Sequence, residues 1–417
     1  MKKVFYLFCI LLAVFLHSNG QSLNDSINVL FIGNSITYFN SMPSTFKDIA
    51  NNQNKKVSVS AYTPGGTGFV NHYNDPNVFN LFKLRTWNIV ILQPGSGESP
   101  GASFPIDTTI KRGKILLDSL YKYNSCAKVF IYQIPYGIPS ATDYNTYFSV
   151  QKMIIDSVYK LADSLNVQII PAGKAFYSYY TQNQNLLLHS NYNDIHPNAF
   201  GSFLIASTAY VSIFQDSIND CTFYSNLYQD TVLRFFTIAD SVVFENPQQW
   251  NINKYNIHSE FNYIPNGLTV QFFNNSTNYS HCFWEFGDNG TSTTSNPSHI
   301  FNQNGTYKIK LTVSHNGCTD STTKYITLET ISVNDFQPFD NLYQIYPNPV
   351  NDFLYINTDD TKSIYSINDM SGRVIKSGKF LNTCLKRIEL SDLQSGLYLI
   401  NIIKSNGTRF QSTFIKQ

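Results

Sequence analysis

Two short segments far apart in the chain carry the residue types of a serine nucleophile and its base. The first, Val29–Ser35, is an apolar run that ends in a Gly-Asn-Ser turn, and the second, Asn193–Asn198, contains Asp194 and His196. A serine hydroxyl is a poor nucleophile at neutral pH, so it needs an imidazole to accept its proton and a further acceptor to fix the imidazole tautomer. Ser35, His196 and Asp194 would supply these groups if the fold brings them together.

Alternating strand-like and helix-like segments are expected to position them. Short apolar runs rich in β-branched residues predict strands at Ile27–Ile32, Val57–Tyr62, Asn88–Gln93, Lys128–Gln133 and Val167–Ile170. Helical patterns predict helices at Ser44–Asn52, Val78–Leu84, Thr108–Tyr123, Tyr144–Leu165 and Asn198–Phe214. This alternation predicts an α/β fold with a parallel sheet covered by helices on both faces.

The order of these segments predicts where the site lies. In sheets of this kind, ligands bind beyond the carboxyl ends of the strands. Ser35 follows the first predicted strand, and Asp194 and His196 precede the last predicted helix. Both are positions at the same edge of the sheet, which is consistent with a single site.

Length and composition limit the classes of function. The chain has 417 residues, which suggests two or three domains. Charged residues make up 14%, against the ~25% typical of globular proteins, and Asn, Ser, Thr and Tyr supply polar bulk, as in many exported proteins. The net charge of +1 gives no electrostatic reason to bind nucleic acid or an anionic membrane surface.

The first residues have the pattern of a secretory signal. Lys2 and Lys3 precede the apolar run Val4–Leu16, and small residues then precede Gln21, so residues 1–20 are interpreted as a cleaved signal peptide. A signal anchor is the alternative, but the apolar run is short for spanning a bilayer. No later segment has the length and apolarity of a membrane span, so the mature chain is expected outside the cytoplasm, with no integral membrane segment.

The cysteines predict disulfides rather than a metal centre. Cys9 lies in the signal, and the other five form no C-x-x-C pair and no Cys/His spacing suited to zinc. No metal and no organic cofactor are expected. The first expected pair is Cys282 with Cys318, a second and weaker expected pair is Cys126 with Cys221, and Cys384 would then be the odd thiol.

Residues 258–328 have alternating apolar positions and frequent turn residues, which predict a β-sandwich. They contain Trp284–Gly290 (WEFGDNG), His299–Phe301 and Gly305–Val313. This segment resembles a PKD-like domain, whose pattern is W-x-F-G-D-G, then H-x-Y, then G-x-Y-x-V-x-L. Asn289 is an insertion relative to that pattern, and Phe301 replaces the tyrosine.

Residues 340–417 form a further β-rich segment after a linker at Thr330–Leu342. Tyr346–Pro349 (YPNP), Asp369–Arg373 (DMSGR) and Leu393–Tyr398 (LQSGLY) occur in order. The segment resembles the C-terminal sorting domain of the Bacteroidota type IX secretion system. The resemblance implies export across the outer membrane by that machinery, with secretion or display at the cell surface; the alternative is an ordinary small β-sandwich.

Residues 24–246 resemble the SGNH (GDSL-like) hydrolases. Gly33-Asn34-Ser35 matches the first conserved block, where the usual sequence is G-D-S, and Asp194-Ile195-His196 matches the last block. The resemblance implies a three-layer, flavodoxin-like α/β/α domain. It also implies that Ser35 is the nucleophile, that His196 is first the general base and then the acid, and that Asp194 orients the imidazole.

The family also implies an oxyanion hole, built from the serine N–H, a glycine N–H and an asparagine side chain. Pro64–Gly68 corresponds to the glycine block, in which Gly65 aligns best and Gly66 is the alternative. The expected G-x-N-D after the third strand is absent, and Gln93 takes its place as a possible side-chain donor. The alternative for Gln93 is a strand-end residue whose amide is already satisfied.

Several other residues near the predicted edge have a structural and a functional interpretation. The functional interpretation places His72 at the cleft and makes Glu98 an alternative acid, but both are expected to be exposed loop residues. His189 is expected to be structural or exposed. Aromatic residues that would either stack on sugar rings or fill the core are Tyr136, Tyr177, Tyr179 and Tyr180.

These patterns lead to two hypotheses of different classes. The first is a secreted serine esterase that hydrolyses ester bonds, with O-acetyl groups on a glycan as the expected substrate and a lipid or simple ester as the alternative. The second is a non-catalytic adhesion or glycan-binding protein on an SGNH scaffold. The intact Ser35, His196 and Asp194 favour the first, whereas the altered third block favours the second.

Overall fold

The computed structural model describes residues 26–329, 336–337, 344–357, 363–370, 372–380, 385–404 and 409–417. The signal segment expected at residues 1–20, most of the expected linker, Cys9 and Cys384 lie outside these ranges. The chain divides into two compact units, the first of which comprises the described residues up to Glu260 together with Ser276–Cys282 and Thr312–Thr322. The expected site residues all belong to the first unit.

A five-stranded parallel sheet forms the centre of the α/β domain, with its strands in the order β2-β1-β3-β4-β5. The strands are β1 (Ile27–Ile32), β2 (Val57–Tyr62), β3 (Ile89–Leu92), β4 (Lys128–Tyr132) and β5 (Gln168–Ile170). The central strand β3 is buried at every position because helices cover both of its faces. The strand order is that of a flavodoxin-like fold, which confirms the predicted fold class.

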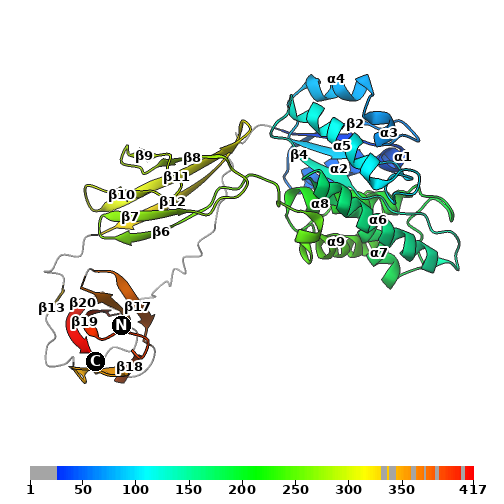
Figure 1. The fold of residues 1–417 in the computed structure, drawn as a ribbon. Helices are drawn as coiled ribbons and strands as arrows, with labels where there is room; N and C mark the ends of the chain where they lie inside the picture. The colour runs from blue at the N-terminus through cyan, green and yellow to red at the C-terminus, as the bar shows by residue number, and fades with distance from the viewer. Residues whose placement is uncertain are drawn as a thin grey trace, which may run out of the picture. The chain divides into compact units, whose positions relative to one another are not determined.

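Helices cover both faces of this sheet (Figure 1). They are α1 (Ser35–Tyr38), α2 (Met42–Asn52), α3 (Phe69–His72), α4 (Pro76–Leu84), α5 (Ile106–Tyr121), α6 (Tyr144–Ser164), α7 (Ala172–Gln182), α8 (Ala199–Phe214) and α9 (Gln229–Phe244). Helix α2 packs against α8, while α3, α4 and α6 pack against α5. Helix α8 is buried along almost its whole length because α2, α7 and α9 surround it.

Four of these helices were not predicted from the sequence. Helices α1 and α3 are single turns, too short for a periodic pattern to be visible. Helix α7 contains several aromatic residues, of which Phe176, Tyr179 and Tyr180 are buried, so tertiary packing outweighs their weak helix propensity. Helix α9 follows Phe214, where the predicted alternation of strands and helices ends.

The β-rich residues that the structure describes form two pairs of mostly antiparallel sheets, with a parallel pairing of Phe336–Gln337 with Arg409 and Phe410. The first pair contains β6 (Phe261–Asn266), β7 (Thr269–Asn274) and β10 (Ser298–Ile300) in one sheet and β8 (His281–Glu285), β9 (Thr291–Ser292), β11 (Gly305–His315) and β12 (Cys318–Leu328) in the other. Trp284 is fully buried between aromatic neighbours in this module, at ring-centroid distances of 5.1 Å from Phe261 and 5.3 Å from Phe272. A β-sandwich core of this kind fits the expectation from the sequence.

The C-terminal module has a separate apolar core that includes Leu354, Ile367, Ile400 and Phe414. One of its sheets contains β13 (Phe336–Gln337), β16 (Ile364–Asp369), β17 (Val374–Lys379), β19 (Gly396–Ile403) and β20 (Arg409–Lys416), and the other contains β14 (Gln344–Tyr346), β15 (Phe353–Asn357) and β18 (Leu385–Glu389). No helix in the described parts of the chain is both long and apolar enough to cross a membrane.

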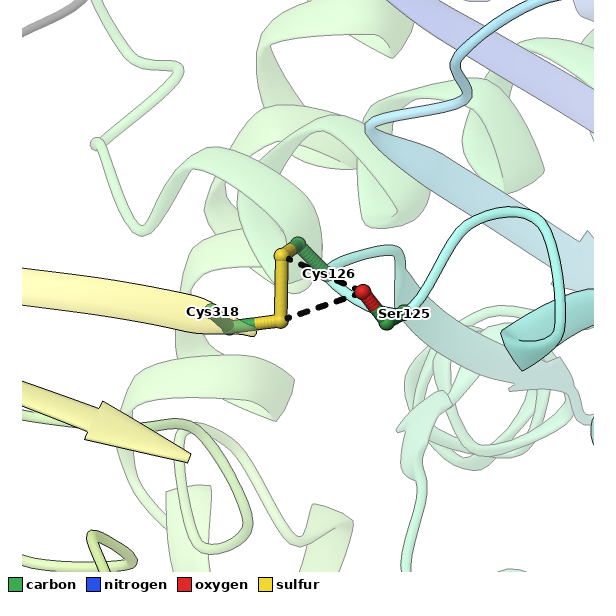
Figure 2. The surroundings of a disulfide bond; sticks show 3 residues. All are labelled: Ser125, Cys126 and Cys318. Carbon is green, nitrogen blue, oxygen red and sulfur yellow. Dashed lines mark hydrogen bonds between the residues drawn. A yellow bond between two sulfur atoms is a disulfide. The ribbon is translucent and has the colours of Figure 1, made fainter. Parts of the chain in front are cut away.

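The disulfide of the first unit joins Cys126 to Cys318, whose Cα atoms lie 5.3 Å apart (Figure 2). The expected pair of Cys282 with Cys318 is therefore wrong. Cys282 lies on β8 and Cys318 on β12, and β11 separates these two strands in the sheet, a spacing of ~9–10 Å that exceeds the reach of a disulfide. The second, weaker expected pair of Cys126 with Cys221 is also wrong, because Cys221 is buried as a free thiol in the α/β core.

Candidate active site

The structure brings the serine, histidine and aspartate of the two motifs into one hydrogen-bonded chain. Ser35 is the first residue of α1 and follows β1 after a turn at Gly33 and Asn34, and His196 and Asp194 lie in the loop before α8. His196 Nε2 lies 2.9 Å from Ser35 Oγ, and His196 Nδ1 lies 2.6 Å from Asp194 Oδ1. Residues separated by 161 positions thus meet at the carboxyl edge of the sheet.

Asp194 fixes the orientation and the tautomer of the imidazole. A carboxylate only accepts hydrogen bonds, so the Nδ1–H of His196 donates to Asp194, and Nε2 is left as the acceptor for the Ser35 hydroxyl. Partial burial of Asp194 raises the pKa of its carboxyl, but hydrogen bonds from the backbone N–H and the ring of His196 outweigh this effect and hold the pKa below its ordinary value. Asp194 is therefore a charged acceptor at neutral pH.

The turn that carries Ser35 has no room for a side chain at Gly33. A Cβ there would lie 2.6 Å from Thr37 Oγ1 and 2.7 Å from Gln93 Oε1. Asn34 caps α1, since its Oδ1 accepts the Ile36 N–H at 3.0 Å. Its Nδ2 donates to the Thr67 carbonyl at 2.7 Å, a bond that the aspartate of the usual G-D-S sequence could not make.

Gln93 supports this same turn. Its side chain is completely buried, and its Oε1 accepts the Asn34 N–H at 3.1 Å and the Thr37 hydroxyl at 2.5 Å. Its Nε2 donates to the Pro94 carbonyl at 3.2 Å. This placement favours the alternative interpretation of Gln93 as a strand-end residue whose amide is already satisfied. An amide enclosed in this way does not face a ligand.

The His72 side chain is buried and links two segments, so the expectation of an exposed residue is wrong. Its Nε2 lies 3.0 Å from the Gly33 carbonyl oxygen and 3.2 Å from Thr67 Oγ1. Burial lowers the pKa of His72, which favours the neutral ring with its Nε2–H donating to Gly33. These contacts join the turn before Ser35 to the glycine loop Pro64–Gly68. The local sequence around His72 does not predict them.

Glu98 is also buried, contrary to the expectation of an exposed loop. Its carboxylate accepts the N–H groups of Phe69, Val70 and Gly95 at 2.7, 2.9 and 2.9 Å. Arg112 on α5 pairs with it at 3.0 Å. Glu98 therefore holds the start of α3, which follows the glycine loop, against the loop after β3.

An aromatic pair between Ser35 and α2 completes the surroundings of His196. The Phe39 ring stacks on the imidazole of His196 with centroids 4.4 Å apart, and Tyr38 stacks on Phe39 at 5.4 Å. The backbone turns back at Asn40, which has a left-handed φ of 51° and donates from Nδ2 to the Pro197 carbonyl at 2.8 Å. Sequence analysis missed these residues, although Tyr38 is three positions after Ser35 on the same helical turn.

Of the other candidate residues, the two glycines are exposed, whereas His189, Tyr179 and Tyr180 are buried in the core. Gly65 and Gly66 are exposed in the loop beside Tyr38, and Gly66 has a left-handed φ of 72°. His189 is buried, and its Nδ1 lies 3.0 Å from the Tyr180 hydroxyl; burial lowers its pKa to about 4. Tyr179 and Tyr180 belong to the core, which favours the structural interpretation for both. The described residues contain no cluster of His, Cys, Asp and Glu suited to hold a metal ion.

Family models match both β-rich segments. Residues 264–329 match the PKD domain model, and residues 344–417 match the model described as a secretion system C-terminal sorting domain. These matches confirm both resemblances stated from the sequence motifs. The sorting domain indicates that the protein is exported to the cell surface or secreted.

Solved structures with similar folds were found at low sequence identity. A DUF4886 family protein from Bacteroides uniformis has 14% identity and a TM-score of 0.45, over 53% of this chain and 96% of that chain. The acetyl xylan esterase AlAXEase has 18% identity and a TM-score of 0.37, over 45% of this chain and 100% of that chain. The PKD1 domain of the Vibrio cholerae metalloprotease PrtV has 29% identity and a TM-score of 0.18, over 18% of this chain and 98% of that chain. No curated protein matched the sequence.

Proposed function

We propose that the α/β domain is a serine ester hydrolase of the SGNH type, in which Ser35, His196 and Asp194 form the catalytic triad. The observation that carries the proposal is the continuous chain from Ser35 Oγ to His196 Nε2 at 2.9 Å and from His196 Nδ1 to Asp194 Oδ1 at 2.6 Å. These are the contacts that proton transfer from serine to histidine requires. The imidazole and carboxylate side chains are about one-third exposed, so a substrate can approach them.

The first half of the reaction forms an acyl-enzyme. Ser35 Oγ attacks the carbonyl carbon of the ester while its proton passes to His196 Nε2, and Asp194 stabilises the resulting imidazolium. The tetrahedral intermediate then loses the alcohol: the bond from carbon to the alcohol oxygen breaks, and His196 returns the proton to that oxygen. The acyl group is left on Ser35.

The second half uses water in place of the alcohol. His196 removes a proton from water as the water oxygen attacks the acyl carbonyl, and it then protonates Ser35 Oγ as the acyl bond breaks. The carboxylic acid leaves, and the enzyme returns to its starting state. The proton transfers in these steps need only the three side chains and water.

Both tetrahedral intermediates carry a negative oxygen that needs hydrogen-bond donors. We assign two of these donors to the backbone N–H groups of Ser35 and Gly65. Ser35 begins α1, so its N–H has no partner within the helix. Gly65 is exposed next to the aromatic side chain of Tyr38. Gln93, the third donor expected from the sequence, is instead assigned to support of the Asn34 turn.

An O-acetyl group on a glycan is the substrate that we favour. Two features support this choice: the sorting domain indicates a location outside the cell, and the residues around Ser35 named above are polar, aromatic or glycine rather than a long aliphatic lining. A short acyl group on a large polar alcohol suits such a site better than a fatty acyl chain, which needs an extended apolar surface.

The direct test is hydrolysis of p-nitrophenyl acetate and octanoate by the full mature chain, with Ser35→Ala as the inactive variant. Ser44, exposed on α2, provides a matched control as Ser44→Ala. Acetate hydrolysis that disappears only in Ser35→Ala supports the proposal, and acetylated xylan and other acetylated polysaccharides are then the next substrates. Full activity in Ser35→Ala would refute the assigned nucleophile.

A further inference from the structure

The third donor of the oxyanion hole is not provided by the residue at the expected position. The Gln93 side chain is fully buried, and its amide nitrogen donates to the Pro94 carbonyl. Its oxygen is occupied by the Asn34 N–H and the Thr37 hydroxyl. Turning this amide toward a ligand would remove the bonds that hold the turn before Ser35, so another side chain is needed for a three-donor hole.

Tyr38 is positioned to supply this donor. It follows Ser35 by three positions in α1, a spacing that places two side chains on the same face of a helical turn. Its hydroxyl oxygen lies 3.6 Å from the point that a Cβ on Gly65 would occupy, so the hydroxyl is next to the glycine assigned to the oxyanion hole. Within the described part of the chain, the hydroxyl has no hydrogen-bond partner, while 46% of the residue is exposed.

The neighbouring residues hold the Tyr38 ring in place. Its ring stacks on Phe39 with an interplanar angle of 26°, and Phe39 stacks on His196. Asn40 then fixes the loop through bonds from its Nδ2 to the Pro197 carbonyl at 2.8 Å and to Ser202 Oγ at 3.0 Å. A side chain held by such contacts needs little reordering when a substrate binds, which is what an oxyanion donor requires.

We propose that the Tyr38 hydroxyl donates the third hydrogen bond to the oxyanion, in the role expected for Gln93. The bond is made to the negative oxygen of the tetrahedral intermediate, with no proton transferred and with the tyrosine neutral throughout. Tyr38 would thus be a catalytic residue in contact with the reacting atoms. This inference rests on the proposed esterase function.

The test compares Tyr38→Phe, which removes only the hydroxyl, with Tyr123→Phe in the full mature chain. Tyr123 is a matched control because it has the same exposed fraction of 46% and lies just after the end of α5, apart from the site residues. Loss of one oxyanion donor typically lowers kcat by ~10²–10³, and we expect a loss of at least about tenfold for Tyr38→Phe on p-nitrophenyl acetate, with KM nearly unchanged. Tyr123→Phe should match the wild type.

A second measurement separates this role from a structural one. n-Butylboronic acid forms a tetrahedral anion on a serine oxygen, so its inhibition constant should rise in Tyr38→Phe by a factor similar to the fall in kcat. If Ser35→Ala is inactive but Tyr38→Phe has normal kcat and normal boronate inhibition, the inference is wrong while the esterase proposal stands. A change in KM alone would also overturn it. Activity in Ser35→Ala would instead refute the esterase function itself.

Discussion

Replacement of Glu98 by alanine should strongly destabilise the α/β domain. The carboxylate is almost fully buried, with 2% of its side chain exposed, and it accepts hydrogen bonds from the Phe69, Val70 and Gly95 N–H groups and from Arg112. Glu98→Ala leaves these donors without their acceptor and leaves the guanidinium, 15% exposed, without its partner. Removing one member of a buried ion pair costs ~3–5 kcal/mol of the free energy of unfolding.

Helix α5 offers a matched control for this prediction. Asp107 pairs with Lys160 at 3.0 Å, but these two side chains are 74% and 56% exposed. An ion pair in water contributes ~0–1 kcal/mol, so Asp107→Ala should change the free energy of unfolding by less than about 1 kcal/mol. Glu98→Gln, which keeps the shape and one acceptor oxygen, should fall between the two alanine variants.

The assay is urea unfolding of the full mature chain, followed by the helical circular-dichroism signal. This signal reports on the α/β domain because the α-helices of the described residues all lie between Ser35 and Phe244. Glu98→Ala should also lower kcat, since it frees the start of α3 and the loop after β3 together. If Glu98→Ala lost no more stability than Asp107→Ala, the burial-based reasoning would be refuted.

Three further results are expected. Asn34→Asp introduces the G-D-S sequence that is usual in SGNH hydrolases, but it replaces a donor by a carboxylate that faces the Thr67 carbonyl. It should lower the free energy of unfolding by ~1–3 kcal/mol together with kcat; an unchanged urea midpoint would contradict this. Burial lowers the pKa of His189 to about 4 in the folded protein, so between pH 6.5 and about 4 the unfolded chain binds a proton at His189 and the folded protein does not. Lowering the pH through this window should therefore reduce the free energy of unfolding by up to about 3 kcal/mol. His189→Asn should flatten that part of the profile, and an equally steep profile in the variant would assign the effect to other groups. Non-reducing peptide mapping should recover Cys126 linked to Cys318; a peptide joining Cys318 to any other cysteine would contradict the structure.

Sequence patterns predicted the α/β architecture well because they are local. Strands β1 and β2 have the expected bounds, and the expected helix at Asn198–Phe214 differs from α8 only at its capping residue Asn198. The predicted topology was also consistent with a single site for Ser35 and His196, which the structure brings together, since a parallel sheet brings the carboxyl ends of its strands to one edge. These inferences needed only periodicity and strand order.

The features that escaped prediction depend on contacts between distant segments. Glu98 and His72 are polar loop residues in sequence, and only the packing of the glycine loop against β1 and the loop after β3 encloses them. The same limit explains Gln93, whose burial depends on the Asn34 turn. The disulfide joins Cys318 to Cys126, 192 positions away. The expected partner, Cys282, was chosen because it lies in the same β-rich module as Cys318, and a partner outside that module could not be found in this way.

The assignment of Ser35 as a nucleophile activated by His196 is tested most directly by covalent labelling. The full mature chain would be treated with paraoxon, which phosphorylates an activated serine, and the modified residue located by mass spectrometry. The wild type should carry one diethyl phosphate on Ser35, and His196→Ala should lose most of this labelling because the base that lies 2.9 Å from Ser35 Oγ is gone. Absence of label on Ser35 in the wild type, or equal labelling in His196→Ala, would contradict the proposed site.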